Sequence, residues 1–456
     1  MGEKNKEQAS MVRDLTSGSV TKQILIFAMP LFVANALQAI YNLVDMVVVG
    51  QVIGGTGMSA VSIGGDVLHL LTFLAMGFAS AGQVIISQYV GARKHHLISK
   101  MIGTMFTFLF AISIIMSVSC YLLRYQILSI LNTPSESYTY TMDYMVICIF
   151  GLIFIYGYNI VSAILRGMGD SRRPFLFIAI AAVINTVLDI FFVAFCHMGV
   201  AGAALATVIG QGASFVISIF YLYRRKEEFG FDFKRESFRI SGEVLKPLLV
   251  LGIPMAIQSA AINISKIVLT AWINAEGVVY SALAGIYNKS ALMMGIVSNS
   301  FTTAGSSMTG QSIGAEKYDR VPRILQVVLT IGLVIATVVS VLLYCFPDMV
   351  CSMFTSDRDV LAKASLVVMP VILNFFGCAT RSGAFSLING SGNSRLNLLV
   401  ALIDGVIGRI GLAALFGFVL SWRSVGFWCG DAVAGFAPIL IGTVFFFSGR
   451  WRKGAQ

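Results

Sequence analysis

Twelve long apolar segments are the feature that most restricts how this chain can fold. A helix needs about 20 predominantly apolar residues to cross a bilayer, and in lipid its backbone polar groups must be satisfied within the helix itself. Charges, Pro, Gly and polar clusters separate segments at approximately 23–50, 58–88, 101–124, 140–165, 174–197, 200–223, 247–273, 278–311, 324–346, 360–388, 396–420 and 424–448. We therefore predict an all-α polytopic membrane protein with twelve transmembrane helices.

The composition agrees with a membrane protein and argues against other classes. The 456 residues are 57% hydrophobic and 12% charged, against about 25% charged in soluble domains. The net charge of +10 comes from Lys and Arg between the apolar segments, without the basic, aromatic-interleaved stretch of a nucleic-acid binder. The seven cysteines stand singly, so neither a disulfide framework nor a metal knuckle is indicated. We expect the lipid bilayer as a partner, no nucleic acid and no cofactor.

The distribution of Lys and Arg predicts the orientation. Of the 32, 24 lie in the two tails and in alternate loops, four lie in the opposite loops, and four lie inside spans. Short cytoplasmic loops are the ones enriched in Lys and Arg, so we expect both termini to be cytoplasmic and the chain to sit in the cell (inner) membrane. The polar segment 1–22 lacks the apolar core of a signal peptide and is interpreted as a cytoplasmic tail.

The sequence repeats itself. "SQYVGARK" (87–94) aligns with "GQSIGAEK" (310–317), and "GMGDSR" (167–172) aligns with "GSGNSR" (390–395), both at an offset of 223. Six spans per copy make this a parallel repeat, which places a substrate cavity between two lobes. The predicted domains are the tail 1–22, an N-lobe 23–223, a charged cytoplasmic linker 224–246, a C-lobe 247–448 and a cytoplasmic tail 449–456.

The order of these motifs, with "MPLFVANALQAIYNLVDMVVVG" in the first span, resembles the multidrug and toxic compound extrusion (MATE) family over residues 20–450. The resemblance implies a V-shaped pair of six-helix lobes around a central cavity, and a monomer without enzymatic activity. It implies a secondary active multidrug efflux transporter, which exports cationic or amphipathic small molecules by antiport with H⁺ or Na⁺ through alternating access. The sequence leaves the coupling ion and the substrate open.

Four polar residues of the first half fall at similar depth. Asp45 lies in the outer half of the first span, Asn185 and Asp189 share one face of the fifth, and Thr207 lies about two turns into the sixth. Intramembrane ionisable groups are functional by default, and an oxygen-rich set suits a proton or a hard cation such as Na⁺. The resemblance implies that these four are the cation-coupling residues of archaeal and DinF-like MATE proteins.

Weaker candidates come from the same resemblance. Gln38, Tyr41 and Asn159 match residues that line the substrate cavity, and Pro30 matches a site of helix kinking. Alternatives remain open, because Thr207 could bond its own helix, Asn185 could only bridge helices, and Pro30 could mark a tolerated bend.

The second half lacks the acidic cluster. At the repeat offsets, Asp45 becomes Leu269 and Asp189 becomes Leu412, and Lys266 follows Asn263 where the NorM branch is expected to carry a glutamate. We therefore place the chain closer to the DinF-like branch. The second-lobe charges inside spans are Lys266, Lys289, Arg381, Asp404, Arg409 and Asp431. Either the cations pair with the aspartates, the interpretation that we favour, or the substrate is partly anionic.

Two rival functions are compatible with parts of the sequence. A lipid-linked precursor flippase of the same superfamily would explain the second-lobe cations, and a non-transporting membrane receptor is the further alternative. "GQSIG" (310–314) matches the pattern of a hydrolase nucleophile, but it follows an apolar span rather than a strand and is interpreted as the end of a helix.

Overall fold

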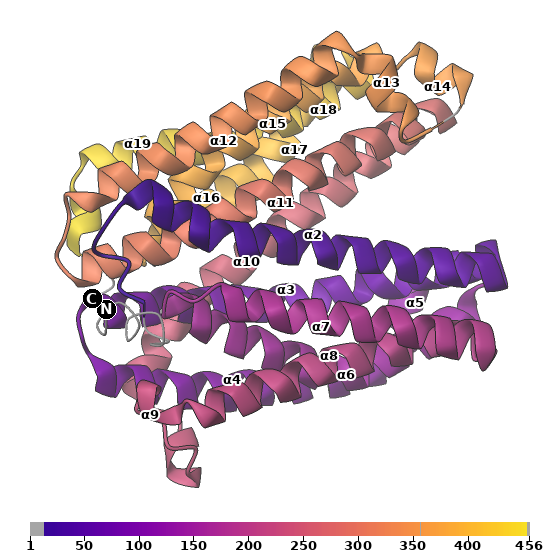
Figure 1. The fold of residues 1–456 in the computed structure, drawn as a ribbon. Helices are drawn as coiled ribbons and strands as arrows, with labels where there is room; N and C mark the ends of the chain where they lie inside the picture. The colour runs from indigo at the N-terminus through magenta and orange to yellow at the C-terminus, as the bar shows by residue number, and fades with distance from the viewer. Residues whose placement is uncertain (1–12, 356, 454–456) are drawn as a thin grey trace. The chain divides into compact units, whose positions relative to one another are not determined.

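The computed structural model describes residues 13–355 and 357–453, and the regular structure in this part of the chain is all helical (Figure 1). In the first half the helices are α2 (Val20–Ile53), α3 (Gly55–Gly91), α4 (His95–Leu122), α5 (Arg124–Ile130), α6 (Tyr138–Gly167), α7 (Arg172–Asp189), α8 (Gly199–Arg224) and α9 (Lys226–Phe229). In the second half they are α10 (Gly242–Asn274), α11 (Val278–Gly314), α12 (Arg320–Cys345), α13 (Pro347–Ser352), α14 (Arg358–Ala362), α15 (Ser365–Gly390), α16 (Ser394–Leu402), α17 (Arg409–Ala414), α18 (Arg423–Ala434) and α19 (Ala437–Phe447).

Eleven of the described helical segments are long and apolar enough to cross a membrane. The eighth predicted span forms the 37-residue helix α11, but it is not among the eleven because Ser, Thr, Asn, Gly and Lys289 dilute its apolar residues. The eleventh predicted span is not one regular helix: α16 and α17 are joined by a π turn at Ile403–Gly408, and a second π turn follows at Leu415–Val419.

By packing, the chain divides into two compact units. One contains Met29–Gly252, and the other contains Asp14–Ala28 together with the chain from Ile253 onward. Helix α2 therefore contributes its beginning to the second unit and the rest, from the residue before Pro30, to the first unit. The predicted charged linker includes α9 and a 3₁₀ turn at Arg235–Phe238, and α10 begins at Gly242, earlier than the predicted start of the seventh span.

The two halves share backbone geometry at equivalent turns. A single glycine, Gly54, joins α2 to α3 with a φ of 84°, and Gly277, 223 residues later, precedes α11 with a φ of 116°. Arg93 and Glu316, which are also 223 residues apart, have similar positive φ values of 56° and 58°. The turns at Gly54 and Gly277 need a positive φ, which glycine adopts without a steric penalty, so the sequence repeat is also a repeat of chain reversals.

The repeated "GMGDSR" and "GSGNSR" motifs are helix starts. The Asp170 carboxylate accepts a hydrogen bond from the Arg172 backbone N–H at 3.0 Å, and the Asn393 side-chain oxygen accepts one from the Leu396 N–H at 3.0 Å. Short polar side chains stabilise helix starts by accepting from otherwise unpaired N–H groups. The motif therefore ends one span and begins the next in both halves.

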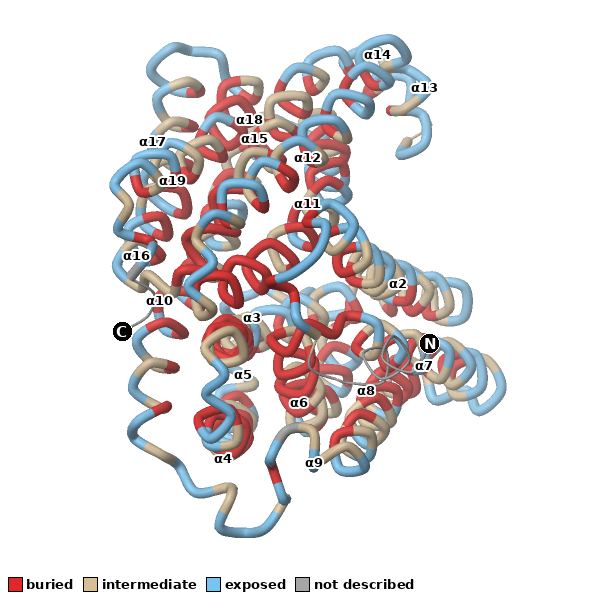
Figure 2. Tube along the Cα trace, turned by 60° about the vertical axis from the view of Figure 1, so that its left-hand side comes forward, coloured by how far each residue is buried: buried red, intermediate tan, exposed pale blue. Residues whose placement is uncertain are grey.

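Burial separates the inner helices from the outer faces. Buried residues predominate along α6, as the red segments of Figure 2 show, and include Tyr144, Tyr156 and Gly157. Many large apolar side chains are nevertheless exposed, among them Phe150 on the outer face of α6 and Val216 on α8. In a chain with eleven candidate spans such side chains face lipid, because the bilayer replaces the core as their apolar environment.

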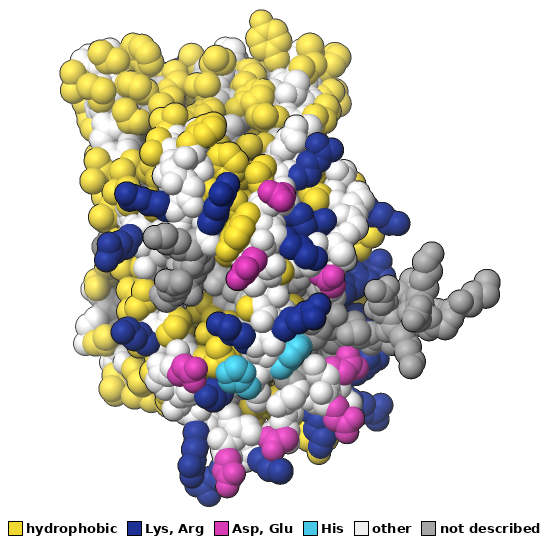
Figure 3. All heavy atoms as spheres, turned by 90° about the vertical axis from the view of Figure 1, so that its left-hand side faces the viewer, with side chains coloured by type: hydrophobic (Ala, Val, Ile, Leu, Met, Phe, Trp, Pro, Cys, Tyr) yellow, Lys and Arg dark blue, Asp and Glu magenta, His cyan; other side chains and the backbone are white. Residues whose placement is uncertain are grey.

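Both tail predictions concern residues that are partly outside the described chain. Residues 1–12 and 454–456 lie outside it. The described part of the N-terminal segment is bound to the second unit, because Arg320 donates to the Gly18 carbonyl at 2.9 Å and Lys317 donates to the Thr16 hydroxyl at 2.9 Å. Near the other end, Trp451 is buried beneath Tyr318. Figure 3 shows Lys, Arg and acidic side chains gathered on one face of the molecule.

The packing of α17 against α18 generates a stability prediction. A Cβ atom at Gly430 would lie 2.3 Å from the Ala413 backbone nitrogen, whereas one at Gly411 would meet nothing within 4 Å. We expect Gly430→Ala to lower the free energy of unfolding by about 1–3 kcal/mol through overpacking. Gly411→Ala, the matched control, leaves stability unchanged or raises it by about 1 kcal/mol. Thermal unfolding in detergent measures both, and equal midpoints for the two variants would contradict the packing.

Candidate functional site

The four predicted cation-coupling residues lie together in the first unit. Thr207 on α8 donates a hydrogen bond to an Asp45 carboxylate oxygen at 3.2 Å, and the Asn185 side-chain nitrogen on α7 donates to the Thr207 hydroxyl at 3.4 Å. Asp189 lies one turn from Asn185, and its carboxyl group is within hydrogen-bonding reach of the Asp45 carboxyl group. Thr207 thus bonds across helices in this cluster, which we call the Asp45 cluster.

The Asp45 cluster faces the interior of the unit. Asp45 and Asn185 are each 3% exposed, and Asp189 is fully buried. On the same helix α7, Val183 and Val187 are 65% and 59% exposed. The helix thus presents alternate faces to lipid and to protein, as 3.6 residues per turn require, and the carboxyl groups do not point into lipid.

The Asp45 cluster has more oxygen acceptors than donors. The second Asp45 oxygen, the Asn185 oxygen and both Asp189 oxygens are buried and accept no hydrogen bond from the described residues. Buried polar atoms are rarely left unpaired, and an unpaired buried carboxylate is expensive. A proton or a hard cation is the species that such a set of oxygens would bind.

Local backbone features position these groups. Helix α7 gives way to a π turn, Ile190–Phe195, directly after Asp189, and such turns frequently occur at functional sites. At Gly210 on α8, a Cβ atom would lie 3.0 Å from the Ala181 carbonyl and 3.2 Å from the Asn185 Cβ. The absence of a side chain there lets α8 approach α7 beside Asn185.

A second contact between α2 and α8 lies one helical turn away. Gln211, four residues after Thr207, donates to the Tyr41 hydroxyl at 3.3 Å, and Gln38 also contacts that hydroxyl. Because Tyr41 stands four residues before Asp45, the Tyr41–Gln211 pair continues the Asp45–Thr207 pair along two antiparallel helices. Gln211 was not among the predicted site residues, although its i, i+4 spacing from Thr207 could have indicated it.

Tyr144 on α6 also lies beside the Asp45 cluster and was not among the predicted site residues. Its side chain is buried, lies within hydrogen-bonding reach of Thr207 and is close to Asp45. A Cβ atom at Gly64 would lie 2.5 Å from the Tyr144 ring, so glycine at that position makes room for the ring. The depth of Tyr144 in the fourth span could have indicated its proximity.

The remaining first-half candidates are placed differently. Asn159 donates to the carbonyl of Ile155 on its own helix at 2.8 Å, and this bond does not join it to the Asp45 cluster. Pro30 lies inside α2, whose helix continues through it. Neither observation tests a role in substrate binding or in bending.

The second unit carries a buried ion-pair network. Arg409 on α17 bonds to Asp431 of α18 and, at 3.2 Å, to Asp404 in the π turn before it. Arg381 from α15 also pairs with Asp404, and Tyr287 donates to Asp431 at 2.6 Å. These pairs satisfy both aspartates, in agreement with the interpretation that they pair with second-lobe cations.

The two lysines are arranged differently from the arginines. Lys266 is exposed and lies within electrostatic range of Asp431 and Arg409. Lys289 is exposed. Among the described residues, neither lysine has a carboxylate within ion-pair distance. The predicted pairing therefore accounts for the arginines but not for the lysines.

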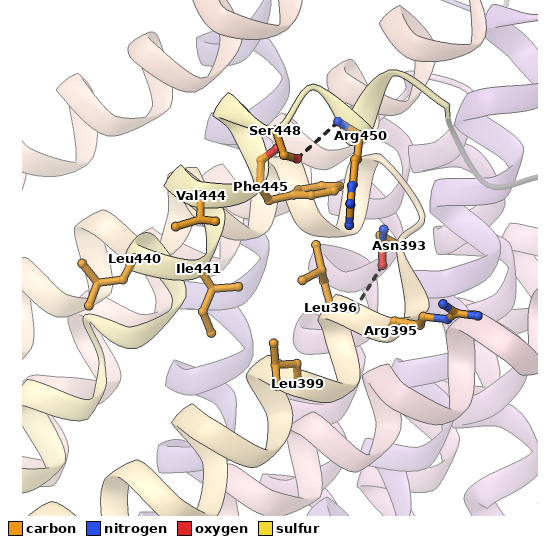
Figure 4. Close-up of a pocket in the computed structure, with 10 residues that line it drawn as sticks. All are labelled: Asn393, Arg395, Leu396, Leu399, Leu440, Ile441, Val444, Phe445, Ser448 and Arg450. Atoms are coloured by element: carbon orange, nitrogen blue, oxygen red, sulfur yellow. Dashed lines mark hydrogen bonds between the residues drawn. The ribbon is translucent and has the colours of Figure 1, made fainter.

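A pocket of about 750 Å³ lies elsewhere in the second unit, between α16 and α19. Figure 4 shows Leu396 and Leu399 facing Ile441 and Val444 across it, with Arg450 at one end. None of the predicted site residues lines it. Ser312 of the "GQSIG" segment is buried near the end of α11, which is not the strand-to-helix turn of a hydrolase nucleophile.

Comparison with known proteins identifies the family. The chain matches MatE twice, over residues 30–191 and 254–414. The chain belongs to the MatE family. The two matched segments begin 224 residues apart, so the family unit itself occurs twice in this MatE chain, as the internal repeat indicated.

Named relatives span the whole chain. The "Probable multidrug resistance protein YoeA" of Bacillus subtilis is 28% identical over 446 residues, which cover 95% of each chain. The "Probable multidrug resistance protein YpnP" of the same organism is 26% identical over 440 residues, covering 96% of this chain and 97% of the relative. A solved structure described as "Crystal structure of MATE in the bent conformation" covers 96% of both chains with a TM-score of 0.86 and 21% identity. The MatE chain thus has the two-lobe fold of this family of multi-pass membrane transporters.

The Asp45–Thr207 hydrogen bond can be tested by a double-mutant cycle on stability. We expect Asp45→Asn and Thr207→Val to be coupled by about 0.5–3 kcal/mol, because the two groups are in direct contact. Ser214, a buried hydroxyl two turns along α8 that donates to the Phe177 carbonyl, provides the control. The Asp45→Asn and Ser214→Ala pair should be additive within about 0.5 kcal/mol. Additivity in both cycles, measured by thermal unfolding, would contradict the contact.

Proposed function

We propose that this protein is a secondary active multidrug efflux transporter. It exports cationic or amphipathic small molecules by antiport with H⁺ or Na⁺ through alternating access. The two Bacillus subtilis relatives, both named as probable multidrug resistance proteins, support drug export. The observation that carries the ion coupling is the Asp45 cluster, in which four buried oxygen atoms lack a hydrogen-bond donor among the described residues.

The proposed coupling residues are Asp45, Asn185, Asp189 and Thr207. A proton can be shared by the two carboxyl groups, and Na⁺ can be bound by their oxygens together with the Asn185 oxygen and the Thr207 hydroxyl. In either case, one positive charge neutralises part of a site that would otherwise attract a cationic drug. Ion entry from outside therefore favours drug release, and ion loss to the inside restores the acidic site.

The energy for this exchange comes from the membrane. A potential of 100 mV supplies about 2.3 kcal/mol for each charge that crosses it, and a concentration gradient of the ion adds to this. We propose Gln38, Tyr41 and Asn159 as cavity-lining residues. The contact of Tyr41 with Gln211 beside the Asp45 cluster supports the first two more than the third.

We also propose a location and orientation. The protein sits in the cell membrane as a monomer with both termini cytoplasmic, as the Lys and Arg distribution predicts. The N-lobe 23–223, the linker 224–246 and the C-lobe 247–448 remain the proposed domain boundaries. The coupling ion binds within the N-lobe, and Pro30 is the proposed point at which the first span bends.

One alternative function has an observation in its favour. A flippase for a lipid-linked precursor would need cations for a pyrophosphate, and Lys266 and Lys289 have no carboxylate partner in the described ion pairs. Export of a cationic dye by the purified protein would favour the transporter, whereas movement of a lipid-linked pyrophosphate without dye export would favour the flippase.

Transport in inverted membrane vesicles tests the proposal. With an imposed proton or sodium gradient, the wild-type protein should move a fluorescent cationic dye, and Asp45→Asn should reduce gradient-driven movement at least about tenfold, because a neutral amide cannot exchange the ion. The gradient that drives transport identifies the coupling ion.

Asp143→Asn serves as the matched control, because this aspartate is exposed near the start of α6. It removes the same charge and should transport as the wild type does. Retained gradient-driven transport by a folded, membrane-inserted Asp45→Asn variant would refute the coupling role.

A further inference from the structure

The ion-pair network of the second unit has more positive than negative groups. Arg381, Arg409 and Lys266 are close to two carboxylates, Asp404 and Asp431, so one formal positive charge is in excess. Removing one unpaired charge from water is costly, and ionisable groups within membrane spans mark functional sites. The acidic Asp45 cluster of the first unit has no such cations, which makes the excess a property of the second unit.

The position of Lys266 is defined by its neighbours. The adjacent Ser265 is buried and donates to the carbonyl of Gly405, in the π turn that contains Asp404. A Cβ atom at Gly405 would lie 2.7 Å from the Ala261 Cβ, so α10 packs tightly on this turn. Lys266 is thereby held near the network, and its side chain is exposed rather than enclosed in the unit.

The two carboxylates are already engaged. Asp431 binds Arg409 and accepts from Tyr287, and Asp404 binds both arginines. Tyr287 in turn stacks on Trp428, with ring centroids 6.2 Å apart. The aspartates therefore leave little acceptor capacity for another donor.

Several buried donors around the network lack an acceptor. They are the Nε atoms of Arg381 and Arg409 and the indole Nε1 of Trp428, none of which has a hydrogen-bond partner in the described chain. Arg409 is 3% exposed and Trp428 is 1% exposed. Unpaired donors beside an accessible lysine call for an acceptor from outside the protein, because buried polar groups are normally paired.

We propose that this network binds the carboxylate of an amphipathic, zwitterionic aromatic substrate. Lys266 supplies the accessible ammonium group, and the arginine network supplies a positive field that is fixed before the ligand arrives. The stacked Tyr287 and Trp428 rings join the network through the Tyr287–Asp431 hydrogen bond and connect it to the apolar core of the unit. The inference rests on the proposed export function, because the bound molecule is a substrate only if the protein exports it. It narrows the cargo to molecules that carry an acid group as well as a cation.

Two dyes that differ in one group test the proposal. A rhodamine with a free benzoate group and the methyl ester of the same dye are bound to the purified full-length protein, and affinity is measured by fluorescence polarisation without any ion gradient. We expect Lys266→Gln to weaken binding of the free acid by about tenfold, the effect of losing one charge-assisted hydrogen bond. Binding of the ester should change less than about twofold.

Two further variants separate charge recognition from general damage. Lys289→Gln removes an equal charge from the same unit and should bind both dyes as the wild type does. Lys266→Arg keeps the positive charge and should bind the acid more tightly than Lys266→Gln. Higher salt should weaken binding of the acid more than binding of the ester.

Specific outcomes would overturn the proposal. These are failure of the wild-type protein to bind the free acid, equal losses for acid and ester in Lys266→Gln, or an equal loss for the acid in Lys289→Gln. Because no gradient is applied, the binding result is independent of ion coupling. Binding of the free acid without gradient-driven export would refute the proposed function and leave the anion site intact. Gradient-driven export without binding of the free acid would refute the anion site and leave the proposed function intact.

Discussion

Burial of two carboxyl groups against each other within a membrane-spanning unit is the constraint on which the first half depends. Asp45 and Asp189 come from different helices; Thr207 donates to Asp45, and neither Asp189 oxygen has a hydrogen-bond partner within the described chain. Their mutual repulsion and lost hydration would push α2 and α7 apart unless positive charge occupied the cluster. Apolar packing of the outer faces against lipid is independent of these two charges, whereas the fit of α2 against α7 at the Asp45 cluster is not.

The second half meets the same constraint in another way. There, Arg381 and Arg409 pair with Asp404 and Asp431, so these carboxylates need no positive charge from outside the protein. The π turns reflect this divergence. The turn after Asp189 has a counterpart at Leu415–Val419, roughly one repeat length later, whereas the turn that contains Asp404 has none among the described elements of the first half. One repeated unit has thus produced an acidic cluster in one copy and a compensated, basic one in the other.

Much of the fold could be predicted from the sequence, because apolar length, charge asymmetry and the offset of 223 are properties of the chain itself. The position of the Asp45 cluster followed from counting residues at about 1.5 Å each. Gln211 and Tyr144 were missed because a glutamine and a tyrosine in an apolar span resemble helix contacts until the neighbouring helix is placed. The pairing of Arg409 with both Asp404 and Asp431 depends on a π turn, which shifts side chains around the helix and leaves no pattern in the sequence.

Helix α2 is divided between the two compact units, and the division falls beside Pro30. The proline has no N–H to donate to the Ile26 carbonyl, so the helix is weakest in hydrogen bonding there. Asp45 lies farther along the same continuous helix. One continuous backbone therefore runs from residues that pack in the second unit, past the proline, to the acidic cluster of the first unit, without any relay of side chains.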